Sequence, residues 1–340
     1  MGIDLPLIWI LILAVGLMMY VVMDGFDLGI GILFPFVADR HHRDIMVNTV
    51  APVWDGNETW LVLGGAGLLA AFPLAYSVLL SALYIPLVLM LVGLILRGVA
   101  FEFRFKADEG HRPFWDNAFA AGSFIATFFQ GAALGAFIDG FTVTGPSYDG
   151  GALDWLRPFS VFTGLGLIVA YSLLGATWLT MKTEGALQAS MIGHATRIVP
   201  ILLVGIIIVS IWTPLTHSAI AHRWFALPDF LFFMPVPVLV VATTWLMLRL
   251  LNGGATGKIP HAGPFILALF LLFLGYTGFA ISLWPNIIPP SVSFRAASAP
   301  PQSQGFTLVG ALLIIPIILS YTMWSYHVFR GKVTGKEGYH

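Results

Sequence analysis

Nine apolar runs follow one another along the chain and restrict its fold more than any other feature. They lie near residues 7–36, 51–72, 75–100, 115–138, 158–181, 197–216, 228–250, 262–284 and 306–329. A helix of about 20 residues crosses a hydrocarbon core roughly 30 Å thick and satisfies its own backbone hydrogen bonds there. Only 10% of the residues are charged, whereas soluble domains carry about 25%. The sequence therefore predicts an all-α polytopic membrane protein, with one integral membrane domain over residues 1–340.

Basic residues are distributed unevenly between the two sides that nine crossings would define. Thirteen fall on one side: Arg40, Arg43, Arg97, Arg104, Lys106, Arg112, Lys182, Arg197, Arg249, Lys258, Arg330, Lys332 and Lys336. Three fall on the other: Arg157, Arg223 and Arg295. Because cytoplasmic loops of membrane proteins are enriched in lysine and arginine, we expect the N-terminus outside and the C-terminus in the cytoplasm.

Composition also excludes several classes of function. A net charge of −1 argues against a nucleic-acid partner, and the absence of cysteine excludes disulfides, iron–sulfur clusters and thiolate chemistry. The nine histidines are all predicted in loops, at the ends of spans or in the C-terminal tail: His41, His42, His111, His194, His217, His222, His261, His327 and His340. A haem held inside a bundle needs axial ligands that face each other there. We therefore expect this chain to ligate no haem and no other metal.

Four carboxylates interrupt the first two apolar runs. Asp24 and Asp27 lie in the first run, and Asp55 and Glu58 in the second; residues three apart share one helical face. An acid at the centre of a spanning helix costs about 2.5–3.5 kcal/mol unless it faces protein or water, or is paired. At 1.5 Å per residue, the second pair lies roughly 5–12 Å and the first roughly 12–17 Å from the cytoplasmic surface. This staggered series predicts a path for protons from the cytoplasm.

A structural role for the same acids is the alternative interpretation. Asp55 would then cap a second helix that begins late. The segment RGVAFEFR ends the third run and brings Arg97, Glu102 and Arg104 to the level of the acids. Either arginine would then form an ion pair with one of the four carboxylates and lock the packing of the helices.

Small and aromatic side chains flank the acids. Glycines accompany both acidic pairs and predict close approach of helix backbones in lipid: Gly25, Gly29, Gly31, Gly64, Gly65 and Gly67. Trp54 and Trp60 flank the second pair, as is typical of interfacial anchors. The indole N–H of either tryptophan would also be able to bind Asn57 or a carboxylate.

Three segments resemble the signature of subunit II of the cytochrome bd-type quinol oxidases. They are DGFDLGIG at 24–31, APVWDGNETWL at 51–61 and RGVAFEFR at 97–104, in the order and spacing of that family. The N-terminal segment is most similar to the cyanide-insensitive branch. In the C-terminal half the resemblance is limited to hydropathy and length.

This resemblance implies a heterodimer in the bacterial cytoplasmic (inner) membrane, in which this chain helps to take up protons from the cytoplasm and to assemble the complex. A larger subunit I would bind two haems b and one haem d, oxidise quinol on the outer side, and reduce oxygen to water with protons from the cytoplasm. The fold would be two four-helix bundles plus one peripheral helix. By resemblance, Asp55 matches an acid that feeds protons toward the haems, and Asp24 and Asp27 match the acids of the first motif. Small accessory subunits, and a quinone or lipid held structurally by this chain, stay open.

Two other functions fit parts of the sequence. A proton- or cation-coupled secondary transporter also needs intramembrane acids, but it would favour broken helices in corresponding halves, and no such symmetry is evident. A structural subunit for assembly and haem retention would need no catalytic residues. Co-purification with a haem-bearing partner discriminates against the transporter. Loss of turnover when the four acids are neutralised discriminates against the structural subunit.

Overall fold

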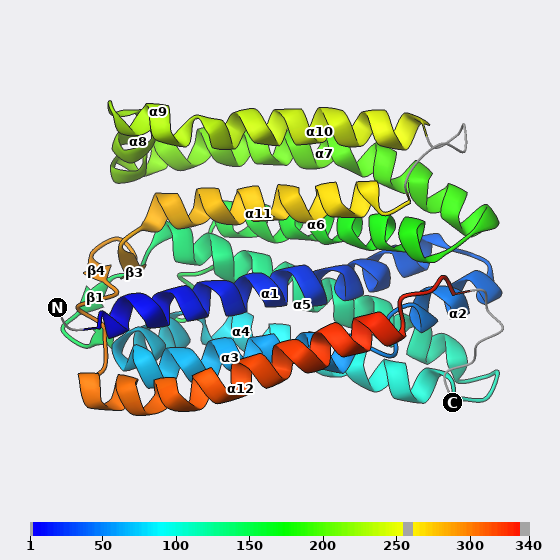
Figure 1. Ribbon diagram of the computed structural model, residues 1–340, viewed down its shortest axis with the longest axis horizontal. Coiled ribbons are helices and arrows are strands. Elements are labelled where there is room, and N and C mark those ends of the chain that lie inside the picture. Colours follow the sequence, from blue (N-terminus) through cyan, green and yellow to red (C-terminus); the bar gives the residue numbers. More distant parts are fainter. Residues whose placement is uncertain (1–2, 254–260, 334–340) are drawn as a thin grey trace.

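Long helices packed side by side make up most of the protein (Figure 1). This computed structural model describes residues 3–253 and 261–333. Its helices are α1 (Leu5–Leu33), η1 (Phe34–Phe36), α2 (Arg40–Asn48), α3 (Trp54–Ala71), α4 (Pro73–Arg104), α5 (Arg112–Asp139), α6 (Pro158–Lys182), α7 (Gly185–Thr216), α8 (Ser218–Phe225), α9 (Asp229–Phe233), α10 (Pro235–Gly253), α11 (Gly263–Leu283) and α12 (Pro301–Val328). Two short antiparallel hairpins pair β1 (Val143–Thr144) with β2 (Ser147–Tyr148), and β3 (Asn286–Ile288) with β4 (Val292–Ser293).

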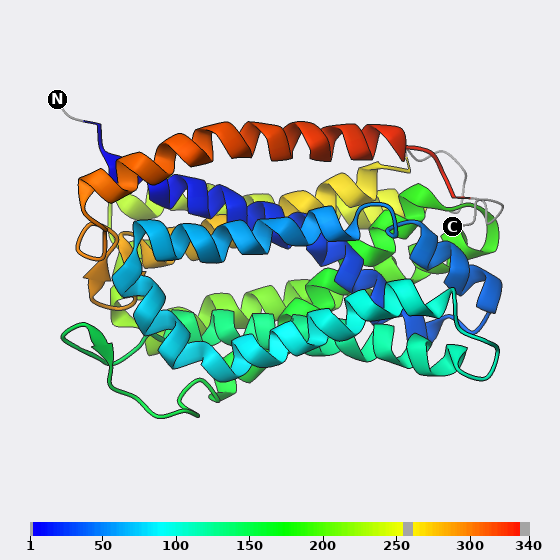
Figure 2. The same cartoon turned by 90° about the horizontal axis from the view of Figure 1, so that it is seen from below.

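The two ends of the helical array carry different elements. Both hairpins lie at the end where α1 and α12 begin, called the hairpin end below, and α2 lies at the opposite end, the α2 end (Figures 1 and 2). The three basic residues predicted to face outward all belong to segments at the hairpin end: Arg157, Arg223 and Arg295. Lys258 and Lys336, which also entered the prediction of orientation, lie outside the described residues, as does His340.

Eight of the described helices are long and apolar enough to cross a membrane, which confirms the prediction of an all-α, multi-span membrane protein. They correspond to eight of the nine predicted runs. The second run, α3, is not among them, because Asp55, Asn57 and Glu58 near its start lower its hydropathy. α3 nevertheless lies along the array and packs on α1, α4 and α12 (Figure 2).

α7 is longer than its apolar run predicts. It begins at Gly185 rather than near residue 197. Buried side chains recur every four residues through the added turns, at Leu187, Met191, Ala195 and Val199. This helical stripe packs on α6 and continues the helix past the apolar run. His194, predicted in a loop or at the end of a span, therefore lies within α7.

α1 and α6 approach each other most closely at glycines. An ideal Cβ atom on Gly29 would lie 1.8 Å from the carbonyl oxygen of Tyr171, and one on Gly25 would lie 2.9 Å from the Tyr171 ring. Only glycine fits such a backbone contact. By contrast, a Cβ on Gly64 or Gly65 of α3 would meet no described atom within 4 Å.

Ion pairs fasten α2 to the ends of α4 and α5. The buried Arg104 lies 2.8 Å from Asp44 of α2 and 2.6 Å from Asp116 of α5. Arg112 also pairs with Asp44, and Arg43 lies 3.3 Å from Asp116. The chain that leads from α2 into α3 is therefore held against α4 and α5.

α12 lies at the edge of the array. It packs on α3 and α1, and among its residues only Gln304 is buried. Its C-terminal end is tied to α6, because Lys182 donates hydrogen bonds from Nζ to the carbonyl oxygens of Phe329 (2.6 Å) and Gly331 (3.3 Å). Such bonds satisfy carbonyl groups at a helix end and fix the last turn of α12 beside α6.

Candidate functional site

The second half of α1 is enclosed by other helices, and this brings its two acids into the interior. Every residue from Met23 to Leu33 is buried, because α3, α5 and α6 pack around α1. Asp24 and Asp27 are both 0% exposed. These acids therefore contact protein rather than lipid, which is one of the conditions under which an intramembrane acid persists.

The carboxylate of Asp24 forms a buried ion pair with Arg97 of α4. Nη2 of Arg97 donates to Oδ1 of Asp24 over 2.6 Å, and Oε2 of Glu58 lies 3.8 Å from the same nitrogen. The guanidinium carbon of Arg97 lies 5.6 Å from the centroid of the Trp54 ring and 5.8 Å from that of Phe101. One buried cation is thus shared by acids of α1 and α3 and is flanked by aromatic rings, which favour a desolvated guanidinium.

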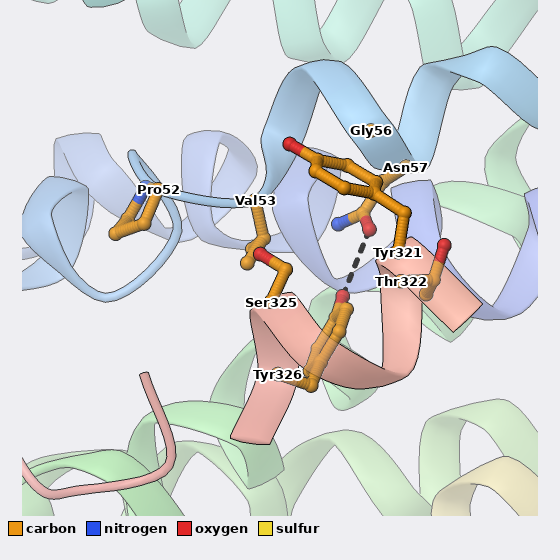
Figure 3. Close-up of a pocket in the computed structure, with 8 residues that line it drawn as sticks. All are labelled: Pro52, Val53, Gly56, Asn57, Tyr321, Thr322, Ser325 and Tyr326. Carbon is orange, nitrogen blue, oxygen red and sulfur yellow. Dashed lines mark hydrogen bonds between the residues drawn. The ribbon is translucent and has the colours of Figure 1, made fainter. Parts of the chain in front are cut away.

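Asp27 is held by an amide rather than by a cation. Asn57 donates from Nδ2 to Oδ2 of Asp27 over 2.8 Å and to the carbonyl oxygen of Met23 over 3.3 Å. Tyr326 of α12 donates its hydroxyl to Oδ1 of Asn57 over 2.8 Å (Figure 3). These hydrogen bonds join α1, α3 and α12 near the α2 end.

Polar atoms without a partner remain inside this cluster. Oδ2 of Asp24, Oδ1 of Asp27, and Nε and Nη1 of Arg97 are buried and make no hydrogen bond to any described residue. Most buried polar atoms in folded proteins are hydrogen-bonded. Atoms of this kind are able to bind water or, on a carboxylate, a proton. Water or a proton at these atoms would satisfy them, and Arg97 balances one negative charge of the cluster.

Three of the predicted site residues are not brought into the cluster. Asp55 is exposed in the first turn of α3 and does not cap that helix. Glu102 is about half exposed and lies 3.5 Å from Lys106 one turn later. Arg104 pairs with acids of α2 and α5 instead of the four carboxylates. Arg104 is buried about two turns beyond Arg97 on α4, and the side chain of Glu102 is exposed.

The two tryptophans of α3 pack within the protein. Trp54 stacks on Phe101 of α4 with ring centroids 5.1 Å apart. Trp60 is buried beside Tyr20 and Met23 of α1, and its indole N–H makes no hydrogen bond to a described residue. Both side chains therefore support the contact of α3 with its neighbours, and neither holds Asn57 or a carboxylate.

Sequence reasoning did not identify Tyr326. Its hydrogen bond to Asn57 joins residues 269 positions apart, and no local motif links them. One signal was available: the predicted topology puts the end of the last apolar run on the same side as the start of the second. A tyrosine at that level is a reasonable partner for polar residues of the second run.

The described part of the chain does not fit a haem or metal site. None of its histidines is buried, and no group of three or more His, Asp or Glu side chains among the described residues could hold a metal ion. A haem inside the bundle needs axial side chains that point inward, and none of the described histidines is buried there.

Comparison with known proteins relates the whole chain to one family. The family model of cytochrome bd terminal oxidase subunit II matches residues 5–329. "Probable cytochrome oxidase subunit 2" of Haemophilus influenzae is 31% identical, over 97% of this chain and 95% of its own length. "Cytochrome bd-I ubiquinol oxidase subunit 2" of Escherichia coli K12 is 28% identical, over 98% and 96%. In a solved bd oxidase from Geobacillus thermodenitrificans, one chain has a similar fold, with a TM-score of 0.74, 18% identity, and coverage of 96% of this chain and 99% of that one.

Proposed function

The chain belongs to the family of cytochrome bd terminal oxidase subunit II, and from this premise we propose that it supplies protons to a partner subunit that reduces oxygen. Membership in this family makes it one subunit of an oxidoreductase complex. The proposed partner is a subunit I that carries haems b and d, oxidises quinol and reduces oxygen to water. Two relatives are named ubiquinol oxidases, so ubiquinol is the first substrate to test. The proposed site of action is the bacterial inner membrane.

One observation carries this proposal: a buried cluster of three charged side chains and an amide at one end of the helical array. Asp24, Asp27 and Arg97 are fully buried, and Asn57 is 1% exposed. A chain that served only as apolar scaffold would have no need for them, because each buried charge carries a desolvation cost. Reduction of oxygen to water consumes protons inside the membrane, and a chain of carboxylates is able to deliver them.

The four acids differ in exposure, and this supports a graded path. Asp55 is exposed, the side chain of Glu58 is 25% exposed, and both acids of α1 are buried. In the proposed path, protons move between the surface of α3 and Asp24 and Asp27, and Arg97 keeps the cluster from accumulating negative charge. Asn57 orients Asp27.

We also propose nine crossings, with α3 as the ninth, arranged as two four-helix bundles. The first would contain α1, α3, α4 and α5, and the second α6, α7, α10 and α11; packing within each set supports this. The exposed surface of α12 supports a peripheral place for that helix. The distribution of basic residues supports a cytoplasmic α2 end and an outer hairpin end.

The test is oxygen consumption by the complex purified from membranes in mild detergent, with ubiquinol as donor. Asp27→Asn and Asp55→Asn should each slow turnover, by on the order of tenfold or more for the buried Asp27, because proton-transfer groups typically contribute at least that much. Haem spectra of the complex should stay normal, including d-type absorption. The exposed Glu102→Gln is the matched control and should turn over at the wild-type rate.

Two outcomes would contradict the proposal. Loss of haem in Asp27→Asn would indicate a role in assembly instead of proton delivery. Unchanged turnover after all four acids are neutralised would indicate a structural subunit. A chain that purified alone and colourless would favour the transporter, but family membership already supports the oxidase.

A further inference from the structure

A small pocket lies beside Asn57, between the segment that leads into α3 and the last turns of α12 (Figure 3). Its cavity volume is about 10 Å³, which is room for roughly one water molecule. Pro52 and Gly56 line one side, and Ser325 and Tyr326 line the other. The pocket is therefore at the α2 end, the end proposed to face the cytoplasm.

The lining of this pocket, called the α12 pocket below, is suited to water. Four hydroxyl-bearing residues line it together with the amide of Asn57: Tyr321, Thr322, Ser325 and Tyr326. A buried water typically makes about three hydrogen bonds to such groups. Because Asn57 also donates to Asp27 over 2.8 Å, one side chain separates the α12 pocket from a buried carboxylate.

The position of Tyr326 is fixed by contacts on its far side. Its ring packs edge-on against Trp178 of α6, with centroids 6.2 Å apart and an interplanar angle of 81°. The indole of Trp178 donates to the hydroxyl of Thr49, just after α2, over 3.3 Å. The Tyr326 hydroxyl is thus held where it donates to Asn57, and it ties the end of α12 to the start of α3.

We propose that the α12 pocket is a water-binding site through which Asp27 exchanges protons with the cytoplasm, and that Tyr326 is a positioning residue that holds Asn57 between the two. This inference rests on the proposed proton-handling function and adds where protons come in. An amide is not a proton carrier, so water must approach the carboxylate beside Asn57, which Tyr326 keeps oriented toward Asp27. A protonated water in the pocket then gives its proton to the carboxylate of Asp27: an O–H bond of the water breaks, a new O–H bond forms on Asp27, and a neutral water remains.

The other side of the cluster then serves as the outlet. Oε2 of Glu58 lies 3.8 Å from Nη2 of Arg97 on α4, and the Glu58 side chain is 25% exposed. Protons would pass from Asp27 to Asp24, one turn earlier on α1, and on to Glu58. The partner subunit would receive them from that face of α3.

Gly56→Ala is the sharpest test, because it puts a methyl group into the α12 pocket without a clash. The nearest heavy atom to the new Cβ is a ring carbon of Tyr321 at 3.7 Å, and alanine favours the helix more than glycine. Gly64→Ala is the matched control: it lies on the same helix, and no described atom is within 4 Å of its Cβ. Proton uptake from solution is followed with a pH dye while the reduced complex reacts with oxygen, and haem spectra report assembly.

Gly56→Ala should slow proton uptake several-fold and raise the solvent isotope effect, whereas Gly64→Ala should do neither. Tyr326→Phe adds no atom and removes only the hydroxyl, so it carries the test if Gly56→Ala fails to assemble. It should slow proton uptake and alter its pH dependence, whereas Tyr84→Phe, at an exposed tyrosine of α4 that does not line the pocket, should do neither.

The outcomes separate this inference from the proposed function. Wild-type proton uptake in both Gly56→Ala and Tyr326→Phe overturns the inference, and slow uptake in Asp27→Asn would then leave the proposed function standing. Normal uptake in Asp27→Asn overturns both.

Discussion

Arg97 is the cation that balances the buried acids of α1. Its guanidinium is 0% exposed, pairs with Asp24 over 2.6 Å, and reaches Glu58 at 3.8 Å. Removal of one partner of a buried ion pair leaves an uncompensated charge and typically costs about 3–5 kcal/mol. Replacement of both partners by neutral side chains costs much less, because neither charge then has to be desolvated.

We therefore expect Arg97→Gln to destabilise the complex by about 3–5 kcal/mol, and the double variant Arg97→Gln with Asp24→Asn to recover most of that loss. Thermal unfolding of the purified complex in detergent measures both. Arg104 offers a comparison: its acids are at the α2 end, so Asp24→Asn should not rescue Arg104→Gln. Equal stability of Arg97→Gln and wild type would show that the ion pair contributes nothing.

At the scale of single residues, the sequence predicts which side chains need a partner better than it predicts which residue that partner is. An acid in an apolar run must be paired or buried, and this rule points to Asp24 and to an arginine at the same depth. The rule does not distinguish Arg97 from Arg104. Both lie in one motif and are seven residues, or about two turns, apart, so both lie on the same face of one helix. The contact between Asn57 and Tyr326 depends on the packing of α12, which no local pattern specifies.

The contact between α1 and α6 can be tested at Gly29. A methyl group there would lie 1.8 Å from the carbonyl oxygen of Tyr171, so Gly29→Ala must push two helices apart. Overpacking of this kind typically costs about 1–3 kcal/mol, and a backbone contact leaves little room to adjust. We expect at least that loss in thermal unfolding of the complex, and none for Gly64→Ala. Equal midpoints for the two variants would contradict the close packing.

The start of α1 predicts a pH dependence. Asp4 accepts hydrogen bonds from Arg295 at 2.6 Å and from the backbone N–H of Leu7 at 3.3 Å, and the Arg295 bond is the main reason that the pKa of Asp4 is lowered. A carboxyl whose pKa is lower in the folded state stabilises the fold above its unfolded pKa of about 4, and this contribution is lost as pH falls through the folded pKa.

Asp4→Asn should therefore lower the unfolding midpoint slightly and by a constant amount above about pH 5, and the difference from wild type should shrink below about pH 4. The effect is small because both side chains are exposed to solvent. Thermal unfolding across this pH range measures it. A difference that grows toward acid pH would contradict the direction of the pKa shift.

Among the elements, apolar runs predict well the helices that lipid surrounds, and they miss helical turns that pack only on protein. α5 and α11 begin and end within three residues of their runs, because lipid sets the length of an apolar run. α7 continues to Gly185, because its added turns pack on protein and need only a stripe of apolar residues. α2 contains Arg40, His41, His42 and Arg43, so hydropathy gives no sign of it; ion pairs to α4 and α5 hold it.

Across the whole molecule, the number of crossings decides which side of the membrane each end faces. α3 has 18 residues, which at 1.5 Å each is about 27 Å, close to the thickness of a hydrocarbon core. Its polar first turns meet Asp27 and Arg97 instead of lipid. A helix with polar residues of this kind crosses only when neighbouring helices bury them. Nine crossings and opposite ends for the two termini therefore require α3 to be packed as described.

The absence of cysteine makes this orientation directly testable. Ser147→Cys lies in the exposed part of β2 at the hairpin end, and Lys106→Cys lies just beyond α4 at the α2 end; neither position belongs to the buried cluster. In intact cells with a permeabilised outer envelope, a membrane-impermeant maleimide should label Ser147→Cys, because few basic residues lie at its end of the array. Lys106→Cys should be labelled only after the inner membrane is broken.

The reversed pattern would put the α2 end, the α12 pocket and the basic residues outside, and protons could then not reach Asp27 from the cytoplasm. Because one reagent reads both positions in a chain with no native thiol, the same experiment tests the orientation and the side from which the proposed path takes its protons.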